Sequence, residues 1–298
     1  MPRWRAVFCD INVFFMPELP EVEVLVRHLH PLLRGATIRA VQVRRAKVIA
    51  PGTPRELSRV LTGAKFKAVS RRGKYLLFSL YSPARRQDFL LLGHLGMTGR
   101  MFLARKSESL PRHAAVVLEL GRANFIYEDP RYFGRFTLDV SPVAKLGPEP
   151  LGKLFSAAEF ARRLKPSRQS IKVKLLDQSL VAGIGNIYAS EALFRAGVSP
   201  RRPANRLTAR QVGKLQAGIR RVLAGAIRCG STIPLNFAPG KTGGLFYFGR
   251  AAGAPDYYGE RLQVYGRAGR PCFQCGSAIR RMVQAARSTF FCPCCQKS

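Results

Sequence analysis

Five of the seven cysteines lie within the last 27 residues, and four of these five have the spacing of a zinc site. Cys272 and Cys275 form one Cys-x2-Cys pair, and Cys292 and Cys295 form a second pair sixteen residues later. Two such pairs supply the four thiolates of a tetrahedral zinc ion. Because protein would fill all four positions, no place remains for an activated water, and we expect one structural Zn²⁺. Cys294 lies inside the second pair and is an alternative ligand.

The chain carries 50 Lys and Arg residues against 17 Asp and Glu residues, a formal net charge of +33. Such a surplus indicates a polyanionic partner, and nucleic acid is the first candidate. Apolar residues make up 47% of the chain, enough to bury a core, which excludes a disordered tail protein. No apolar run reaches the about 18 residues that a membrane span needs. Three arginines between the cysteine pairs could reach phosphates from a zinc-fixed hairpin: Arg280, Arg281 and Arg287.

The first half of the chain predicts one helix followed by many strands. Residues 18–33 place apolar side chains three and four residues apart and are closed by Gly35, which is typical of a helix. Between residues 36 and 139, short apolar runs separated by Gly and Pro predict a sandwich or barrel. These runs are ATIRAVQV, KFKAVSRR, YLLFSL, FLLLGHL, AAVVLEL, NFIYE and GRFTLDV.

The second half predicts a helical domain that begins after the Gly-Pro-Glu-Pro segment 147–150. Helical periodicity covers residues 157–164, 174–197 and 208–228. Residues 233–259 are rich in Gly, Pro and aromatic residues without a clear period, and they predict a long loop of the kind that is often functional. The cysteine-rich tail follows this loop.

Six motifs stand in the chain in one order: MPELPEVEVL (16–25), HLGMTG (94–99), DPRYFGRF (129–136), LGPEPL (146–151), GIGNIYASEALF (183–194) and VYGR before the tail. With them, the chain from residue 16 onward resembles the formamidopyrimidine-DNA glycosylases of bacterial base excision repair. The resemblance implies an α+β multi-domain fold. An N-terminal helix plus β-sandwich would span 16–142, and a helix-two-turn-helix domain would span 143–265, with a lesion-capping loop at about 231–259. A zinc-finger β-hairpin would span 266–298.

The resemblance implies a bifunctional DNA glycosylase and abasic-site lyase that removes formamidopyrimidine and 8-oxoguanine from duplex DNA. Its catalytic residues would be Pro17, Glu18, Lys74 and Arg287. Proline is a secondary amine, and so a nucleophile for a Schiff base, only when it is the N-terminal residue. Glu18 would move the proton at the sugar as a general acid–base, and β,δ-elimination would then cleave the strand. Glu21 would support Glu18, although charge at a helix N-terminus accounts for both glutamates without any catalysis.

An enzyme of this kind must flip the damaged nucleotide and fill the gap that the base leaves. The resemblance assigns this task to Met97, Arg131 and Phe133, an apolar wedge with a guanidinium and an aromatic ring. The alternative for Met97 and Phe133 is a place in the core. The family commonly has an arginine where this chain has Tyr132, so one phosphate contact would be lost or replaced by a hydroxyl.

Phosphate contacts are expected from Lys74, Arg287 and Asn186, the last with backbone amides of a helix entered through Gly183 and Gly185. The alternative for the two glycines is an ordinary tight turn. His94 is assigned to the DNA-binding set, with a structural histidine as its alternative.

Fifteen residues precede Met16, and they would lock the nitrogen of Pro17 into an amide that cannot attack. An early start codon, proteolytic trimming and a retained extension are the three explanations, and we expect residues 1–15 to be absent from the mature protein. A retained extension would favour a non-catalytic protein that binds damaged DNA. The nearest alternative enzyme removes oxidised pyrimidines, but its members generally begin PEGPE, so Leu19 argues against it. We expect a monomer that binds damaged double-stranded DNA at the bacterial nucleoid in the cytoplasm, with no membrane contact.

Overall fold

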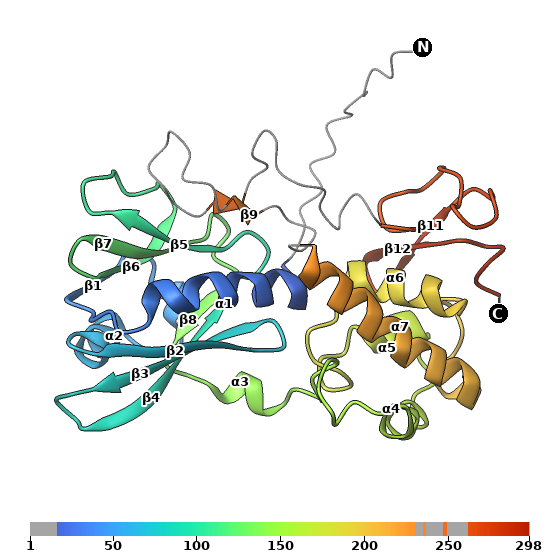
Figure 1. Ribbon diagram of the computed structural model, residues 1–298, viewed down its shortest axis with the longest axis horizontal. Helices are drawn as coiled ribbons and strands as arrows, with labels where there is room; N and C mark the ends of the chain where they lie inside the picture. The colour runs from blue at the N-terminus through green and yellow to red at the C-terminus, as the bar shows by residue number, and fades with distance from the viewer. Residues whose placement is uncertain (1–16, 230–234, 237–246, 249–261, 298) are drawn as a thin grey trace, which may run out of the picture.

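The structure, a computed structural model, describes residues 17–229, 235–236, 247–248 and 262–297 (Figure 1). The expected extension 1–15 and nearly all of the expected capping loop lie outside the described residues. The described chain has an N-terminal lobe of strands, a helical lobe and a C-terminal hairpin, with helix α1 (Leu19–Leu33) extending from the first lobe toward the second. The α+β fold expected from the sequence is confirmed.

Two four-stranded antiparallel sheets build the N-terminal lobe. One has the order β2-β3-β4-β8, with β2 (Lys65–Arg72), β3 (Tyr75–Ser82), β4 (Gln87–His94) and β8 (Arg135–Thr137). The other has the order β1-β6-β7-β5, with β1 (Ala40–Val43), β6 (Ala114–Glu119), β7 (Ala123–Glu128) and β5 (Arg100–Arg105). The rings of Phe78 and Phe125, one from each sheet, meet edge to face with centroids 5.6 Å apart. The sandwich is therefore closed by aromatic packing between its sheets.

Three elements of this lobe were not predicted: β5, the 3₁₀ turn η1 (Ala46–Ile49) and helix α2 (Pro54–Leu61). Helix α2 has a local signal, because Thr53 Oγ1 accepts the Glu56 N–H at 3.2 Å and Glu56 Oε2 accepts the Thr53 N–H at 3.5 Å. This reciprocal pair is a capping box, which is readable in a sequence. The strand predicted over 36–43 begins only at Ala40, since Thr37 forms an isolated bridge with Lys65.

Helix α1 contributes to the cores of both lobes. Leu25 and Leu29 lie in the core of the sandwich, and both are fully buried. Leu19, at the other end of the helix, lies in the core of the helical lobe, where α1 packs against α7. The first turn of α1 is therefore fixed by the lobe that follows it in sequence.

The helical lobe contains α3 (Ser141–Ala144), α4 (Ala157–Leu164), α5 (Ile171–Leu175), α6 (Asn186–Ala196), η2 (Ala204–Arg206) and α7 (Ala209–Arg228). The prediction of helix throughout 174–197 is wrong for its middle part, which forms turns between α5 and α6. Gly183 has φ +86°, a left-handed conformation that interrupts a right-handed helix. Helix α6 therefore begins after the second glycine of the GIG segment.

The C-terminal hairpin pairs β11 (Arg280–Gln284) with β12 (Arg287–Phe291) through a two-residue turn. Ala285 and Ala286 both have positive φ, 47° and 58°, as a tight hairpin turn requires. The base of the hairpin packs on α6, because Phe194 shares a small core with Cys272 and Cys292. Strands β9 (Leu235–Asn236) and β10 (Tyr247–Phe248) form a short antiparallel pair.

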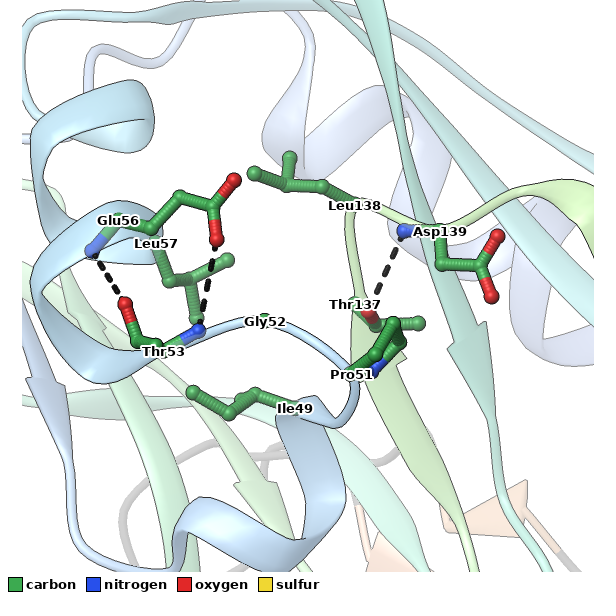
Figure 2. Close-up of a pocket in the computed structure, with 9 residues that line it drawn as sticks. All are labelled: Ile49, Pro51, Gly52, Thr53, Glu56, Leu57, Thr137, Leu138 and Asp139. Carbon is green, nitrogen blue, oxygen red and sulfur yellow. Dashed lines mark hydrogen bonds between the residues drawn. The ribbon is translucent and has the colours of Figure 1, made fainter.

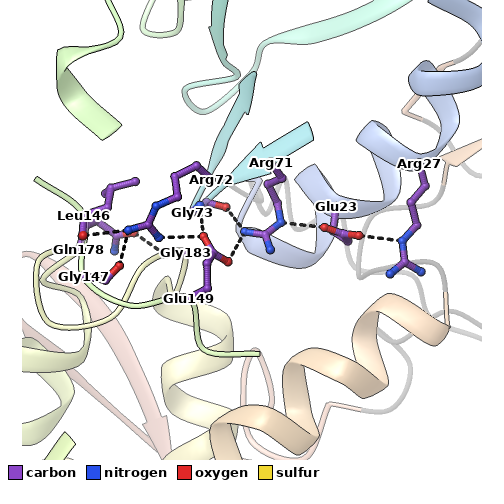
Figure 3. Close-up of polar contacts among 10 residues, drawn as sticks. All are labelled: Glu23, Arg27, Arg71, Arg72, Gly73, Leu146, Gly147, Glu149, Gln178 and Gly183. Atoms are coloured by element: carbon purple, nitrogen blue, oxygen red, sulfur yellow. Dashed lines mark hydrogen bonds and ion pairs between the residues drawn. The ribbon is translucent and has the colours of Figure 1, made fainter. Parts of the chain in front are cut away.

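Glu149, in the linker between the lobes, binds the turn that joins β2 to β3 (Figure 3). Its Oε1 accepts the Gly73 N–H at 2.7 Å and Arg72 Nη1 at 3.0 Å, and its Oε2 pairs with Arg71 Nη1 at 2.7 Å. Arg71 Nε continues to Glu23 of α1 at 2.9 Å. One carboxylate thus joins the linker, the sandwich and α1.

We predict that Glu149→Gln lowers the free energy of unfolding by about 2 kcal/mol, because it removes charge-assisted hydrogen bonds to Gly73 and Arg72. Urea unfolding followed by circular dichroism measures the change. Glu108→Gln removes an exposed carboxylate elsewhere and should leave the unfolding free energy within about 0.5 kcal/mol of the parent. Equal losses in both variants would contradict the assigned role of Glu149.

Candidate functional site

The carboxylate of Glu18 lies against the first turn of α6, 169 residues away in sequence. Its Oε1 accepts the Ile187 N–H at 2.9 Å, and its Oε2 accepts the Tyr188 N–H at 3.4 Å. The side chain is 2% exposed, and the buried Pro17 precedes it directly. Because the N-terminal amides of a helix have no partner within the helix, a carboxylate is well placed there.

The two glycines of the GIG segment make room for this contact. A Cβ on Gly185 would lie 2.2 Å from Cδ of Glu18, and one on Gly183 would lie 2.6 Å from Cδ1 of Leu19. Both distances are far below any van der Waals contact, so a side chain at either position would displace the start of α1. In the structure, the Ile187 and Tyr188 amides, near which the sequence predicts a phosphate contact, donate to Glu18.

Glu21 fixes the same corner from inside the helix α1. Its Oε2 accepts the Glu18 N–H at 2.9 Å, and its Oε1 accepts the hydroxyl of Tyr188 at 2.7 Å. The side chain is fully buried. Two carboxylates therefore stand side by side at the junction of the lobes, and both are bonded to the start of α6.

Burial is the main cause that raises the pKa of Glu18 to about 7; Lys74 and the two α6 amides act against this rise, and Glu21 adds to it. Burial lowers the pKa of Lys74, and Arg287 lowers it too, whereas Glu18 and Glu21 raise it. Lys74 comes from the β2–β3 turn and Arg287 from the C-terminal hairpin. The structure thus brings three of the four expected catalytic side chains within electrostatic reach, beside Pro17.

Lys172, which the sequence analysis missed, is buried next to this group with 1% exposure. Its Nζ donates to Oδ1 of Asn186 at 2.5 Å, and Nδ2 of Asn186 donates to the carbonyl of Ser288 at 2.8 Å. Burial lowers the pKa of Lys172 to about 8, Glu18 raises it, and Arg287 lowers it. Asn186, an expected phosphate contact, therefore ties α5 and α6 to the hairpin beside Arg287. The only sequence signal was a lysine that directly follows Ile171, a residue of the helical core.

The three expected wedge residues lie on two loops that one aspartate holds together. Asp129 accepts the hydroxyl of Thr98 at 2.7 Å and the backbone N–H groups of Arg131 at 3.2 Å and Gly134 at 2.9 Å. Phe133 is 49% exposed, which is unusual for such a ring, and the Arg131 guanidinium lies 4.8 Å from its centroid. Met97 is partly exposed next to Thr98. Asp129 stands before a proline, a turn signal that sequence reasoning could have used.

His94, at the end of β4, and Tyr132, between Arg131 and Phe133, have partners within the protein. Nδ1 of His94 accepts the Gly96 N–H at 3.1 Å, and burial, with Lys74 and Arg135 nearby, lowers the histidine pKa to about 4. The ring is therefore neutral at pH 7. The hydroxyl of Tyr132 accepts Nε of Arg45 at 3.0 Å, so the loop keeps a guanidinium close to it.

The four paired cysteines form the metal site. The Sγ atoms of Cys272, Cys275, Cys292 and Cys295 all lie within 4.8 Å of one another. The Cys272–Cys295 sulfur distance is 3.9 Å and the Cys275–Cys292 distance is 3.5 Å, close to the about 3.8 Å edge of a tetrahedron with zinc–sulfur bonds of about 2.3 Å. The exposed Cys294 is outside this group. The donor set fits one structural zinc ion.

A pocket of about 290 Å³ lies elsewhere, between η1, α2 and the end of β8 (Figure 2). Its polar groups already bind one another, since Thr53 and Glu56 cap α2 and Thr137 Oγ1 accepts the Asp139 N–H at 3.2 Å. None of the expected site residues lines this pocket. The candidate site is therefore the junction of the lobes.

Among the described residues, no helix is long and apolar enough to cross a membrane.

A sandwich lobe, a helical lobe and a zinc-binding hairpin that place cations around a buried carboxylate define a protein that acts on nucleic acid. The chain belongs to the formamidopyrimidine-DNA glycosylase family. Residues 16–136 match the formamidopyrimidine-DNA glycosylase N-terminal domain, residues 146–236 match its H2TH domain, and residues 269–297 match the zinc finger found in FPG and IleRS.

Curated relatives and solved structures agree with this assignment. The formamidopyrimidine-DNA glycosylase of Desulfitobacterium hafniense is 41% identical over 288 residues, which cover 94% of this chain and all of that protein. A Lactococcus lactis FPG mutant bound to DNA containing Fapy-dG is similar with a TM-score of 0.81 and 32% identity, over 95% of this chain and all of the other. A MutM complex with DNA containing carbocyclic 8-oxo-G gives a TM-score of 0.82 and 34% identity over the same shares.

We predict that the buried carboxyl of Glu18 makes stability fall with pH. Its folded pKa of about 7 exceeds the ordinary 4.5, so the folded state holds the proton more tightly than the unfolded state. The resulting stabilisation is complete below pH 4.5 and is lost as pH rises to about 7, at most about 3 kcal/mol. Urea unfolding between pH 4 and 8 should show this slope in the parent. In Glu18→Gln the slope should be shallower, and an unchanged slope would show that Glu18 is not the titrating group.

We predict that Cys275→Ser abolishes stoichiometric zinc and that Cys294→Ser retains one zinc per chain. The four-sulfur group contains Cys275 but not Cys294. Atomic absorption on purified protein measures the metal, and a chelator should unfold the hairpin in the parent because zinc binding contributes folding free energy. Zinc loss in Cys294→Ser would instead identify Cys294 as a ligand.

Proposed function

We propose that this protein is a DNA glycosylase and abasic-site lyase that removes oxidised purines, formamidopyrimidine and 8-oxoguanine, from duplex DNA. The observation that carries the proposal is the convergence of the Pro17–Glu18 corner, Lys74 and Arg287 at one point, from α1, the β2–β3 turn and the zinc hairpin. Relatives with the same architecture include structures bound to DNA containing Fapy-dG and carbocyclic 8-oxo-G.

The proposed reaction begins when the nitrogen of Pro17 attacks C1′ of the damaged nucleotide, the bond from C1′ to the base breaks, and the leaving base takes up the proton that the proline nitrogen loses. Glu18, whose pKa is raised to about 7, holds a proton near neutral pH and donates it to the ring oxygen of the sugar as the ring opens. The product is an iminium between Pro17 and C1′. This cation acidifies the neighbouring C2′ proton, so elimination of the 3′ phosphate and then the 5′ phosphate cleaves the strand.

The remaining residues bind and distort the DNA in this proposal. Lys74 and Arg287 contact the phosphates around the flipped nucleotide. Met97, Arg131 and Phe133 enter the gap in the duplex, and the exposure of Phe133 supports that role. A protein with this substrate would act at the nucleoid.

The chemistry requires a chain that begins at Pro17, because an amide nitrogen has no basic lone pair. The 298-residue chain carries sixteen residues before Pro17, so its own activity would be limited to binding damaged DNA. That observation favours non-catalytic damage binding as the second function, for the longer form alone. The two forms differ only at this nitrogen and at the segment before it, which makes them a matched pair.

We predict that protein beginning at Pro17 forms a covalent adduct with an 8-oxoguanine duplex in borohydride and that the 298-residue protein does not. Glu18→Gln in the shorter form should slow single-turnover excision by at least about a hundredfold, since a general acid–base is worth about that much. Gel electrophoresis detects the covalent adduct, and intact mass spectrometry determines at which residue the protein begins. Efficient excision by protein whose mass includes residues 1–16 would refute Pro17 as the nucleophile.

A further inference from the structure

The helical lobe has a second basic surface at the end that faces away from the sandwich. In Figure 1, α4 and the start of α7 lie together at this end of the molecule. We call the set Lys165, Arg168, Arg202, Arg206 and Arg210 the outer basic surface. Arg202 is partly buried, and the other four side chains are exposed. None of them belongs to the site at the junction of the lobes.

The charge of this surface is not compensated by neighbouring carboxylates. From Phe160 to Cys229 the chain has only two acidic residues, Asp177 and Glu191. Asp177 pairs with Lys174 at 2.8 Å, and Glu191 is buried and accepts backbone N–H groups of the segment before the zinc site. Glu159 of α4 pairs with the arginines 162 and 163. Within the described part of the chain, no ion pair involves the outer basic surface.

Backbone hydrogen bonds hold the two halves of this surface at a fixed spacing. The Asn205 N–H donates to the carbonyl of Ser167 at 3.0 Å, and the Ala204 N–H donates to that of Gln169 at 2.8 Å. Arg202 Nε donates to the carbonyl of Arg206 at 3.0 Å. The backbone segments that carry the five side chains therefore hold a fixed relative position, so the segments themselves lose little entropy on binding.

The frame continues without a break into the candidate site. The Ile171 N–H donates to the carbonyl of Arg202 at 2.7 Å, and the next residue, Lys172, reaches Asn186. Gln284, at the turn of the zinc hairpin, donates to the hydroxyl of Ser170 at 3.0 Å. The outer basic surface is therefore joined directly to the residues that hold Asn186 and the zinc hairpin.

We infer that the outer basic surface binds backbone phosphates of the same duplex, in the flank beyond the damaged nucleotide on the side of the zinc hairpin. The inference rests on the proposed function. A cluster of cations without carboxylate partners repels itself in the free protein and gains most from a rigid polyanion whose phosphates repeat at regular spacing. These contacts carry no sequence information, and they lengthen the footprint over which the enzyme grips DNA.

The test compares the double variant Arg168→Gln/Arg206→Gln with the control Arg55→Gln/Arg59→Gln. The two control arginines are exposed and lie on helix α2 of the opposite lobe. The probes are duplexes with a central stable abasic-site analogue, of about one helical turn and of about three turns. Fluorescence anisotropy gives the affinity at several salt concentrations. On the long duplex, the surface variant should lose about 1.8 from the slope of log K against log salt, about 0.9 for each phosphate contact. On the short duplex its slope should equal that of the parent.

The inference would be overturned by no change on the long duplex, by an equal loss on both duplexes, or by an equal loss in the control variant. A loss seen only when a second, unlinked duplex is added would also overturn it, because the surface would then serve another DNA molecule. Excision from the short duplex by protein beginning at Pro17 is measured in parallel and should be unchanged in the surface variant. If the parent itself fails to excise, the proposed function fails, while the salt slopes still decide whether the surface binds DNA.

Discussion

The contact between the Glu18 carboxylate and the first amides of α6 is the constraint on which the arrangement of the site depends. It joins the first turn of α1 to a helix of the other lobe, and it is possible only because Gly185 has no side chain. The same carboxylate satisfies two otherwise unpaired N–H groups and occupies the position that an anion would take at that helix end. A free carboxylate at this point would be solvated, whereas here it is buried and has a raised pKa.

Around this contact, each lobe contributes a cation that is fixed by its own local structure. Lys74 lies on a turn that Glu149 holds through the backbone of Gly73, and Arg287 follows the tight turn of the zinc hairpin. Lys172 is held by Asn186, which also binds the carbonyl of Ser288 in the hairpin. Zinc, the linker carboxylate and the start of α6 thus act on one site from different directions. Loss of any one of them would displace a charge relative to Glu18.

The strongly basic composition has two different uses in the structure. Lys74 and Lys172 lie at the junction of the lobes, where burial lowers the pKa of both and the charge of Lys74 lowers that of Glu18. Most others lie on the surface, and those of the outer basic surface have a rigid backbone frame and no carboxylate partner among the described residues. Burial suits proton transfer, and exposure suits phosphate binding, because water screens an exposed charge without abolishing its attraction for a polyanion.

The sequence by itself determined the features that are encoded over short stretches of chain. Cysteine spacing gave the zinc site, alternating and helical periodicity gave the sandwich and most of the helices, and the ordered motifs gave the family. Local patterns also carried signals that were overlooked, such as the capping box at Thr53 and Glu56 and the turn residue Asp129. Helical periodicity could not show that residues 174–197 form two helices with turns between them, because the apolar residues there suit a buried turn as well as a helix.

Only the tertiary structure decided which groups meet. Glu149 bears no local mark of its role, since the residues that it binds, Arg72 and Gly73, are more than 70 positions away in sequence. Lys172 shows only a lysine among core residues, which does not reveal that it binds Asn186. The GIG glycines could be assigned to a phosphate until the structure showed the side chain of Glu18 in that place. The physical reason is that burial and long-range charge, which set the pKa of Glu18, arise from packing between lobes. Neither quantity exists in the unfolded chain.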